Sequence, residues 1–358
     1  MLPDLPLIDH HVHGVVTGPL DRAGFEQLIT ESDRPVPPGM STFDSQLGLA
    51  IRRHCAPLLE LDPHASADDY LAARAQQDPS VFLRAAGVSD YLVDTGYLGN
   101  LDDLATLSGA RTHEVVRLES ELEYVASHES SAAAVPDAFV RRLAERTADA
   151  VGLKSIVAYR HGFDLDPTEP SATEVLTALD RWYAAGAERV TDPVLLRWLL
   201  WMGVRRGLPL QLHTGFGDPD LNLHTANPLL LTEWLRLVEP LGTPVVLLHC
   251  YPFHREAGYL AQVFPHVSFD VGLTTMYVGA RAAAVVAESL ELAPFAKLLY
   301  SSDAAGPAEL HYLGAALWRR AVDTVLNGFV EQGEWSRADA ERVARLWGRE
   351  NAQRLYQI

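Results

Sequence analysis

The chain has 358 residues, of which 48% are hydrophobic and 21% charged, a composition typical of a globular protein with a sizeable core. Its net charge is −18 and no run of lysine or arginine forms a basic patch, so we expect neither nucleic acid nor an anionic membrane as a partner. Cys55 and Cys250 are the only cysteines, which excludes a disulfide framework and a zinc site built from thiolates.

The N-terminal stretch shows no signal for export. Residues 1–6 contain no positively charged segment followed by an apolar core, and no apolar run in the chain reaches the length of a membrane span. We therefore expect a cytoplasmic protein.

The first predicted element is a buried strand at residues 5–8, which leads into a histidine-rich stretch that ends at Gly14. Side chains alternate between the two faces of a strand, so His11 and His13 point the same way and can both reach one divalent ion. Two surface histidines after a strand would leave the same short pattern. Only the polar residues further along the chain favour metal binding by this motif.

A long segment without strand alternation, residues 15–80, follows Gly14. It contains helical patterns at residues 45–59 and 67–76 and a break rich in proline and glycine at residues 35–39. Structureless loops of this length are rare in compact domains. We predict an inserted helical subdomain, or lid, that covers the ends of the strands.

From residue 91 onward, strands alternate with helical segments. Seven further strands are predicted, at residues 91–94, 114–119, 151–158, 209–213, 244–249, 266–271 and 296–301. This alternation predicts a parallel sheet, and eight strands indicate a closed (β/α)₈ TIM barrel, an α/β fold, rather than an open doubly wound sheet. No Gly-x-Gly-x-x-Gly follows a strand, which argues against dinucleotide binding. We predict one barrel domain over residues 1–358.

Polar residues gather at the C-terminal ends of these strands, and in a barrel such ends meet at one mouth where the active site lies. Imidazole and carboxylate ligands suit zinc first, with manganese or iron as alternatives. A single histidine at a strand end is usually structural, but coincidences at strands 1, 5, 6 and 8 together favour a metal site. The candidates are His11, His13, Lys154, His213, His249 and Asp303.

This pattern resembles the amidohydrolase superfamily, which has Asp-x-His-x-His after strand 1, histidines ending strands 5 and 6, and an aspartate after strand 8. The similarity is greater to the amidohydrolase-2 branch, which also contains decarboxylases. Longer stretches resemble the hydrolase-like domain that precedes a glutamine-synthetase-like domain in nodulin/FluG-type fusion proteins. These stretches are residues 152–160, 212–218, 248–260, 301–304 and 350–356, and the resemblance covers essentially the whole chain.

The resemblance implies a role for each site residue. His11, His13 and Asp303 would hold the metal, with His213 as a further ligand. Asp303 would act as general base toward water and then pass the proton to the leaving nitrogen. His249 would either bind a second ion or stabilise charge on the substrate.

Two interpretations of Lys154 stay open. The resemblance implies that a strand-4 lysine carries a carbamate that bridges two metal ions, and the alternative is a lysine that contacts substrate or an ion pair. The number of ions, one or two, depends on this choice.

Residues just beyond the strand ends are candidates for binding substrate: Arg160, His161, Tyr251, His254, Arg255 and Glu256. The planar guanidinium of an arginine matches a substrate carboxylate bidentately. Each of these residues could equally stabilise its own loop. Residues 214–216 could line the pocket, and Asp94 and Glu119, which end strands 2 and 3, could orient the imidazoles.

We predict a metal-dependent hydrolase that cleaves a C–N bond of a small carboxylate-bearing substrate with metal-activated water. The FluG-type resemblance implies a γ-glutamyl amide, because a glutamine-synthetase-like enzyme makes such bonds. A non-oxidative decarboxylase on the same metal site is the alternative. A non-catalytic binding protein is less favoured because His11, His13, His213, His249 and Asp303 are all present. The sequence leaves the oligomeric state open, a homo-oligomer included.

Overall fold

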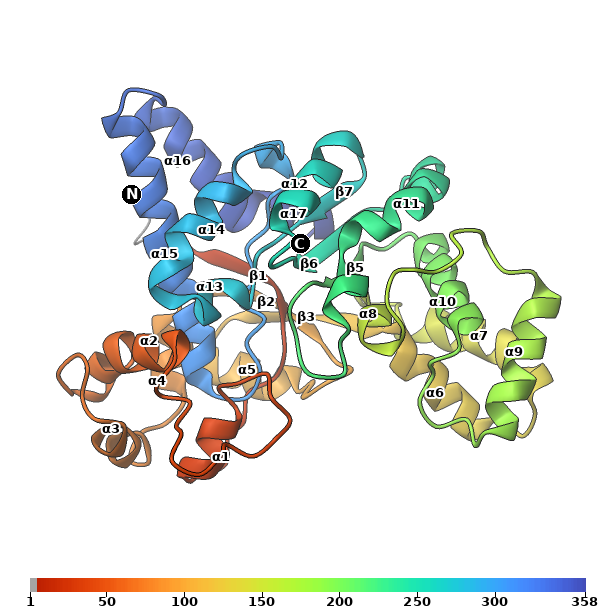
Figure 1. Ribbon diagram of the computed structural model, residues 1–358, viewed down its shortest axis with the longest axis horizontal. Coiled ribbons are helices and arrows are strands. Elements are labelled where there is room, and N and C mark those ends of the chain that lie inside the picture. The colour runs from red at the N-terminus through yellow and green to blue at the C-terminus, as the bar shows by residue number, and fades with distance from the viewer. Residues whose placement is uncertain (1–4) are drawn as a thin grey trace.

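The computed structural model describes residues 5–358 and is built around seven parallel strands that are neighbours in chain order (Figure 1). The part of the N-terminal stretch at residues 1–4 lies outside the described residues. The strands are β1 (Leu7–Val12), β2 (Val88–Asp94), β3 (Arg111–Arg117), β4 (Gly152–Ser155), β5 (Leu210–Thr214), β6 (Val245–His249) and β7 (Val267–Phe269). The predicted parallel sheet is confirmed.

An irregular segment, residues 298–304, fills the eighth position. Leu299 N donates to Phe269 O of β7 at 3.1 Å, and on the other side His10 N of β1 donates to Tyr300 O at 3.1 Å. The backbone N–H of Ser302 donates instead to the carboxylate of Asp9 at 2.9 Å, which interrupts the ladder. The predicted strand at residues 296–301 is therefore not regular, although the barrel that it was expected to close is confirmed.

Helices surround the strands (Figure 1). The bounds of one of them, α10 (Pro193–Arg206), follow from its sequence, because Asp192 caps its first turn, proline occupies its first position and Gly207 ends it at φ 80°. The other helices that follow β2 are α5 (Leu101–Ser108), α6 (Leu118–His128), α7 (Val135–Arg146), α8 (Val157–Arg160), α9 (Ala172–Ala184), α11 (Thr232–Val238), α12 (His254–Val263), α13 (Thr274–Tyr277), α14 (Ala282–Ser289), α15 (Ala308–Glu331), α16 (Arg337–Arg345) and α17 (Asn351–Tyr356). None of the helices in residues 5–358 is long and apolar enough to cross a membrane.

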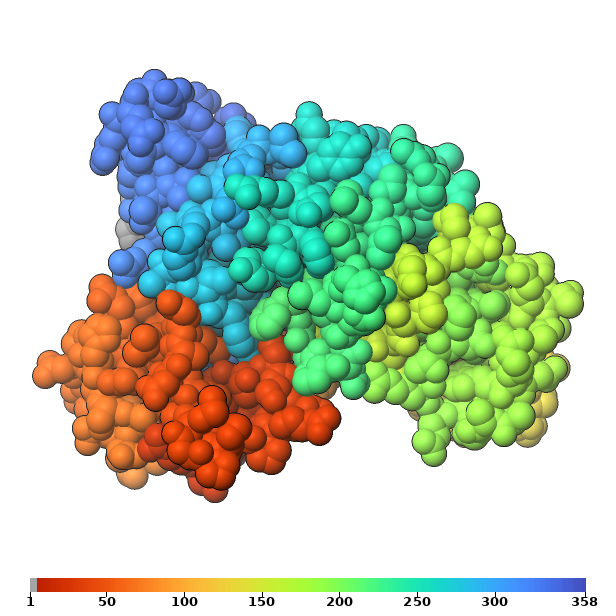
Figure 2. All heavy atoms as spheres, in the orientation of Figure 1, coloured from red at the N-terminus to blue at the C-terminus, as the bar shows by residue number. Residues whose placement is uncertain are grey.

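The segment between β1 and β2 is helical. It forms a lobe coloured red to orange in Figure 2. Its aromatic residues Phe25, Phe43 and Tyr70 are buried in one apolar cluster with residues of α15. Its helices are α1 (Arg22–Gln27), α2 (Gln46–His54), α3 (Ala67–Arg74) and α4 (Ser80–Ala85). A function as a lid stays a prediction.

Three strands, β3, β4 and β7, end earlier than the sequence predicts. Glu119 does not end β3 but lies in the first turn of α6, where its carboxylate accepts hydrogen bonds from Ser155 Oγ at 2.6 Å and Ile156 N at 3.0 Å. These bonds take the backbone beyond Ser155 out of the sheet, and α8 begins at Val157.

A small apolar cluster joins several strands to the C-terminal helix. Residues of β1, β2, β3 and β6 pack against Ala352 and Tyr356 of α17, and the strand residues are Ile8, Leu92, Val115, Val246 and Leu248. Tyr356 thereby brings its hydroxyl to His10 of β1, at 3.1 Å from Nδ1. The last helix is thus part of the barrel core.

Arg319 of α15 should be important for stability, because its guanidinium donates to Ala86 O at 2.6 Å, Gly87 O at 2.9 Å and Leu5 O at 3.1 Å. Arg319→Met leaves these carbonyls without the charged donor, and we expect the free energy of unfolding in urea to fall by about 3 kcal/mol. The control is Arg320→Met at the exposed neighbouring position, which should change it by less than about 0.5 kcal/mol. Equal losses in the two variants would contradict this role.

Candidate metal centre

The carboxylate of Asp303 lies among three of the predicted histidines. Its Oδ1 is 3.1 Å from His11 Nε2 and 3.5 Å from His13 Nε2, and its Oδ2 is 3.4 Å from His249 Nε2. The Asp303 side chain is only 11% exposed, and the imidazoles are equally buried or more so. The strand ends thus bring four predicted metal ligands together at one point.

These residues fit a divalent ion. One nitrogen of His11, one of His249 and one carboxylate oxygen of Asp303 all lie within 4.8 Å of one another. Within the described residues, His249 Nε2 and His213 Nε2 are buried without a hydrogen-bond partner. Unpaired buried polar atoms are costly, and a metal ion supplies the missing partner.

Gln211 fixes the tautomer of His11. The amide nitrogen of Gln211 donates to His10 O and to Tyr356 Oη, both at 2.8 Å, so its oxygen is the atom that faces His11 Nδ1 at 2.8 Å. Because Gln211 Oε1 can only accept, His11 Nδ1 carries the proton and donates. The lone pair of His11 therefore lies on Nε2, the nitrogen nearest Asp303.

Burial keeps the imidazoles in the form that binds metals. It lowers the pKa of His11 to about 3 and that of His249 to about 4, with Lys154 adding to both shifts. Burial alone would raise the pKa of Asp303, but the histidines around it, His249 most of all, hold it well below its usual value. At neutral pH the site therefore presents neutral imidazoles and an ionised carboxylate, as metal binding requires.

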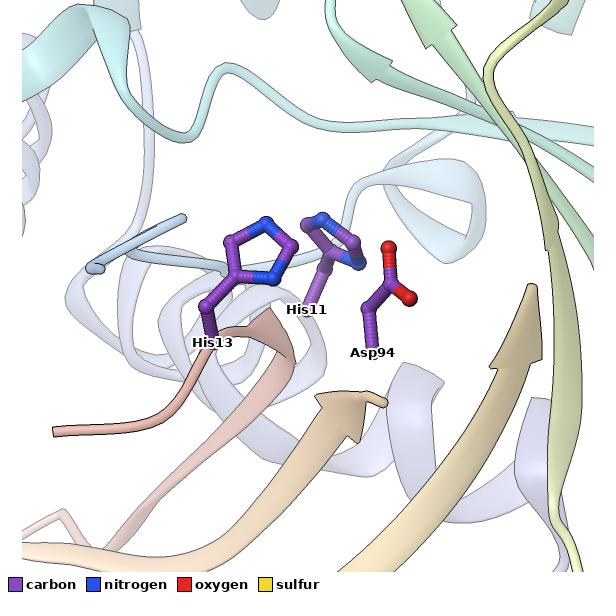
Figure 3. Close-up of side chains that lie close together, drawn as sticks. All are labelled: His11, His13 and Asp94. Atoms are coloured by element: carbon purple, nitrogen blue, oxygen red, sulfur yellow. The ribbon is translucent and has the colours of Figure 1, made fainter. Parts of the chain in front are cut away.

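A second group of donors shares His11. Figure 3 shows the carboxylate of Asp94, at the end of β2, beside the rings of His11 and His13. Arg117 donates to this carboxylate through Nη2 at 2.5 Å and through Nε at 3.1 Å. The oxygens of Asp94 are thus already engaged by a cation, so we assign the ion to Asp303 and the histidines around it.

Lys154 lies at the centre of the site, as its position on β4 predicts. Its Nζ is 3.2 Å from His11 Nε2, and burial lowers the pKa of its ammonium to about 8. A contact with the metal-binding nitrogen of His11 is compatible with both interpretations of this residue. Its carbamylation stays a prediction.

His213 is the next-to-last residue of β5, one position before the strand end, and lies beside the donor groups rather than in them. Its ring centroid is 4.7 Å from that of His249 and 4.2 Å from that of Tyr159. The loop after β5 closes over it, since a Cβ on Gly217 would lie 3.0 Å from His213 Nε2 and 2.1 Å from Tyr159 Oη. Glycine is required there by this close approach.

The predicted substrate-binding residues are engaged within the protein. Arg160 Nη1 lies 3.1 Å from Glu123 Oε1, and His161 Nε2 lies 3.8 Å from Asp164 Oδ1. On α12 and the loop before it, the contacts are Tyr251 stacked on His254, His254 with Glu288 at 2.6 Å, and Arg255 with Glu291 at 2.9 Å, while Glu256 is partly exposed. These contacts favour loop stabilisation, and substrate binding by these residues stays a prediction.

One polar contact close to the site is not predicted by the sequence. Glu31, from the helical segment after β1, accepts a hydrogen bond from Tyr277 Oη at 2.8 Å, and Phe216 packs edge-on against Tyr277. Burial raises the pKa of Glu31 to about 7, and the charge of Asp303 contributes to this rise. Segment 15–80 carries no motif from which this contact could be predicted.

Comparison with known proteins agrees with this geometry. The sequence profile of the amidohydrolase family, Amidohydro_2, matches residues 8–358. The chain belongs to the amidohydrolase family. The predicted membership is therefore confirmed.

Two relatives resemble this amidohydrolase over nearly its whole length. The fluG protein of Emericella nidulans is 29% identical over 99% of the chain, which spans about half (46%) of that protein. A Lactobacillus casei protein described as a metal-dependent hydrolase is 30% identical, with a TM-score of 0.86 over 99% of this chain and 96% of the other. Uronate isomerase from Thermotoga maritima, at 14% identity and a TM-score of 0.62 over 99% and 95%, shares the fold.

Loss of the Gln211 oxygen should weaken metal binding without unfolding the chain. Gln211→Leu removes the acceptor that holds the His11 ring, and we expect zinc affinity to fall 10- to 100-fold, about the usual effect of losing such a partner. Competition with a chelating dye measures this. Gln332→Leu, at an exposed position after α15, is the control and should bind zinc as the wild type does.

Glu31 should make the stability of the metal-free amidohydrolase depend on pH. Its folded carboxyl keeps a proton up to about pH 7, whereas the unfolded chain loses it near the ordinary glutamate value of 4.5. The folded state binds more protons in this window, so the free energy of unfolding should fall as pH rises from about 4.5 to 7.

The variant Glu31→Gln cannot titrate, and urea unfolding between these pH values should show a shallower fall for it than for the wild type. Glu233→Gln, at an exposed position on α11, should leave the wild-type slope unchanged. An unchanged slope in Glu31→Gln would contradict the raised pKa.

Proposed function

We propose that this amidohydrolase uses water to cleave a C–N bond in a small substrate, with zinc as its metal. The observation that carries the proposal is the position of Asp303, whose two oxygens face histidines of β1 and β6. A carboxylate so placed can serve both a metal ion and a water molecule at the barrel mouth.

Residues of this chain would perform the proton transfers. When bound by His11, His13 and Asp303, a divalent ion lowers the pKa of water and polarises a carbonyl oxygen. Asp303 is ionised, so it can accept a proton from water and deliver it to the leaving nitrogen. His249 is neutral, and its nitrogen at 3.4 Å from Asp303 is placed to hold a developing negative oxygen through a proton or through a second ion.

A γ-glutamyl amide is the substrate that we propose. The similarity to the fluG protein supports this choice, because the resemblance to FluG-type fusions links such domains to glutamine-synthetase-like chemistry. The α-ammonium group of a glutamyl substrate needs a nearby acceptor, and the carboxyl group of Glu31 is a candidate. Glu31 is close enough to Asp303 and His13 for their charges to affect its pKa. Once a substrate cation lowers its pKa, Glu31 can pair with that ammonium.

The proposal is tested by product analysis with the zinc-loaded enzyme and a panel of γ-glutamyl amides. We expect glutamate and amine in equal amounts and no CO₂. Asp303→Asn keeps the shape of the side chain but removes the base, so kcat should fall by about 10²- to 10⁴-fold. Asp137→Asn, at an exposed position on α7, should have wild-type kcat.

Two outcomes would contradict the proposal. Release of CO₂ without amine would favour the decarboxylase, and wild-type kcat in Asp303→Asn would remove this residue from the proton transfers.

A further inference from the structure

A cavity lies apart from the metal centre, between α2, the short helix Gly279–Arg281, α14 and α15. Its volume is about 410 Å³, within the range of small-molecule sites. None of its lining residues is acidic, and the basic ones are Arg53, His54, His64 and Arg320.

The charge of this cavity is opposite to that of the protein. The chain carries 47 acidic against 29 basic residues, and most of its described arginines lie within 4 Å of a carboxylate. Arg53 of α2 and Arg320 of α15 both line the cavity. Among residues 5–358, neither arginine has an ion pair or a side-chain hydrogen bond. Two arginines that line the same cavity, with no acidic residue in its lining, indicate a ligand that brings the negative charge.

The basic residues face one another. Burial lowers the pKa of His54 to about 4, and the positive charges of Arg53, Arg320 and His64 contribute to this shift. His54 is therefore neutral at pH 7, and one of its ring nitrogens can donate a hydrogen bond beside the arginines.

Most of the rest of the wall is apolar and consists of leucines and alanines. Leu49 and Arg53 are four residues apart on α2, as Leu317 and Ala321 are on α15, so each pair lies on one helix face toward the cavity. Alanines at positions 50, 282, 283 and 321 leave space that larger side chains would fill. A ligand thus meets a cationic end and an apolar surface in one cavity.

We propose that this cavity binds a small organic anion. The phosphate or carboxylate group of the ligand lies between Arg53 and Arg320, whose planar donors match oxyanions, and its apolar body lies against Leu49 and the alanines. The concave shape and the volume of the cavity fit a small molecule better than the flat surface of a second copy of the chain.

The cavity also borders the segment that leads to the metal centre. Gln46 Oε1 accepts a hydrogen bond from Ala280 N at 3.1 Å, and Tyr277, which holds Glu31, precedes Ala280 by three residues. A ligand in the cavity would therefore contact the same stretch of chain that carries Tyr277.

Calorimetry on the full zinc-loaded chain tests the proposal, with phenyl phosphate, inorganic phosphate and phenol as probes. We expect phenyl phosphate to bind one site, inorganic phosphate to bind it more weakly and phenol not to bind, because the site needs both the anion and the apolar body. Arg53→Met and Arg320→Met should each raise the Kd for phenyl phosphate about 10-fold or more. Arg236→Met, at an exposed position on α11, should not change it.

Two further variants separate this cavity from the metal centre. Ala283→Met fills the cavity without changing its charge and should abolish binding, so the test does not depend on the arginine variants alone. Asp303→Asn should leave binding intact. The proposal fails if phenyl phosphate does not bind, if binding is lost in Asp303→Asn but kept in Arg53→Met, or if the arginine variants instead dissociate a dimer seen in sedimentation.

Discussion

One buried carboxylate, that of Asp270, ties together the strands that carry the metal centre. Its Oδ2 accepts from His10 Nε2 at 2.7 Å and from Ser301 Oγ at 3.0 Å, and its Oδ1 accepts from His249 N at 2.7 Å. Burial alone would raise the pKa of Asp270, but His10 lowers it to about 2, so the group stays charged. The charged hydrogen bonds of Asp270 therefore hold the last segment of the barrel, residues 298–304, to β1. They also fix the positions of the metal ligands that β1 and β6 carry.

Hydrogen bonds in the same region stabilise the strained backbone at the site. His249 has φ 67° and Asp303 has φ 53°, values that are uncommon for residues other than glycine. Each is held by a hydrogen bond from its own backbone: the N–H of His249 donates to Asp270, and the N–H of Asp303 donates to His11 O at 3.1 Å. Such strain persists only where surrounding bonds over-determine it, as they do at functional sites. The bends turn both side chains toward the barrel mouth.

The sequence was sufficient to predict which histidines and which aspartate meet at the site, but not which residues orient them. Alternation of strands and helices predicts the barrel, and histidines at strand ends predict which side chains meet, because parallel strands end on one side. Gln211 and Asp270 were missed although each is a polar residue inside an apolar run, a signal that marks the barrel interior. The partners of His254 and Arg255 lie on α14 and just beyond it, more than 30 residues away, and pairing at that distance leaves no local pattern.

The number of metal ions and the state of Lys154 are linked by charge. Around His11 the buried charges of Asp94 and Asp303 are balanced by Arg117 and the ammonium of Lys154, so the cluster is neutral without metal. One divalent ion brings this cluster to +2. A carbamate on Lys154 would replace one positive by one negative charge, and two ions would then give the same +2. Two ions beside an unmodified ammonium would give the cluster a net charge of +4. Burying so large a net charge is energetically unfavourable. A second ion therefore requires a change at Lys154.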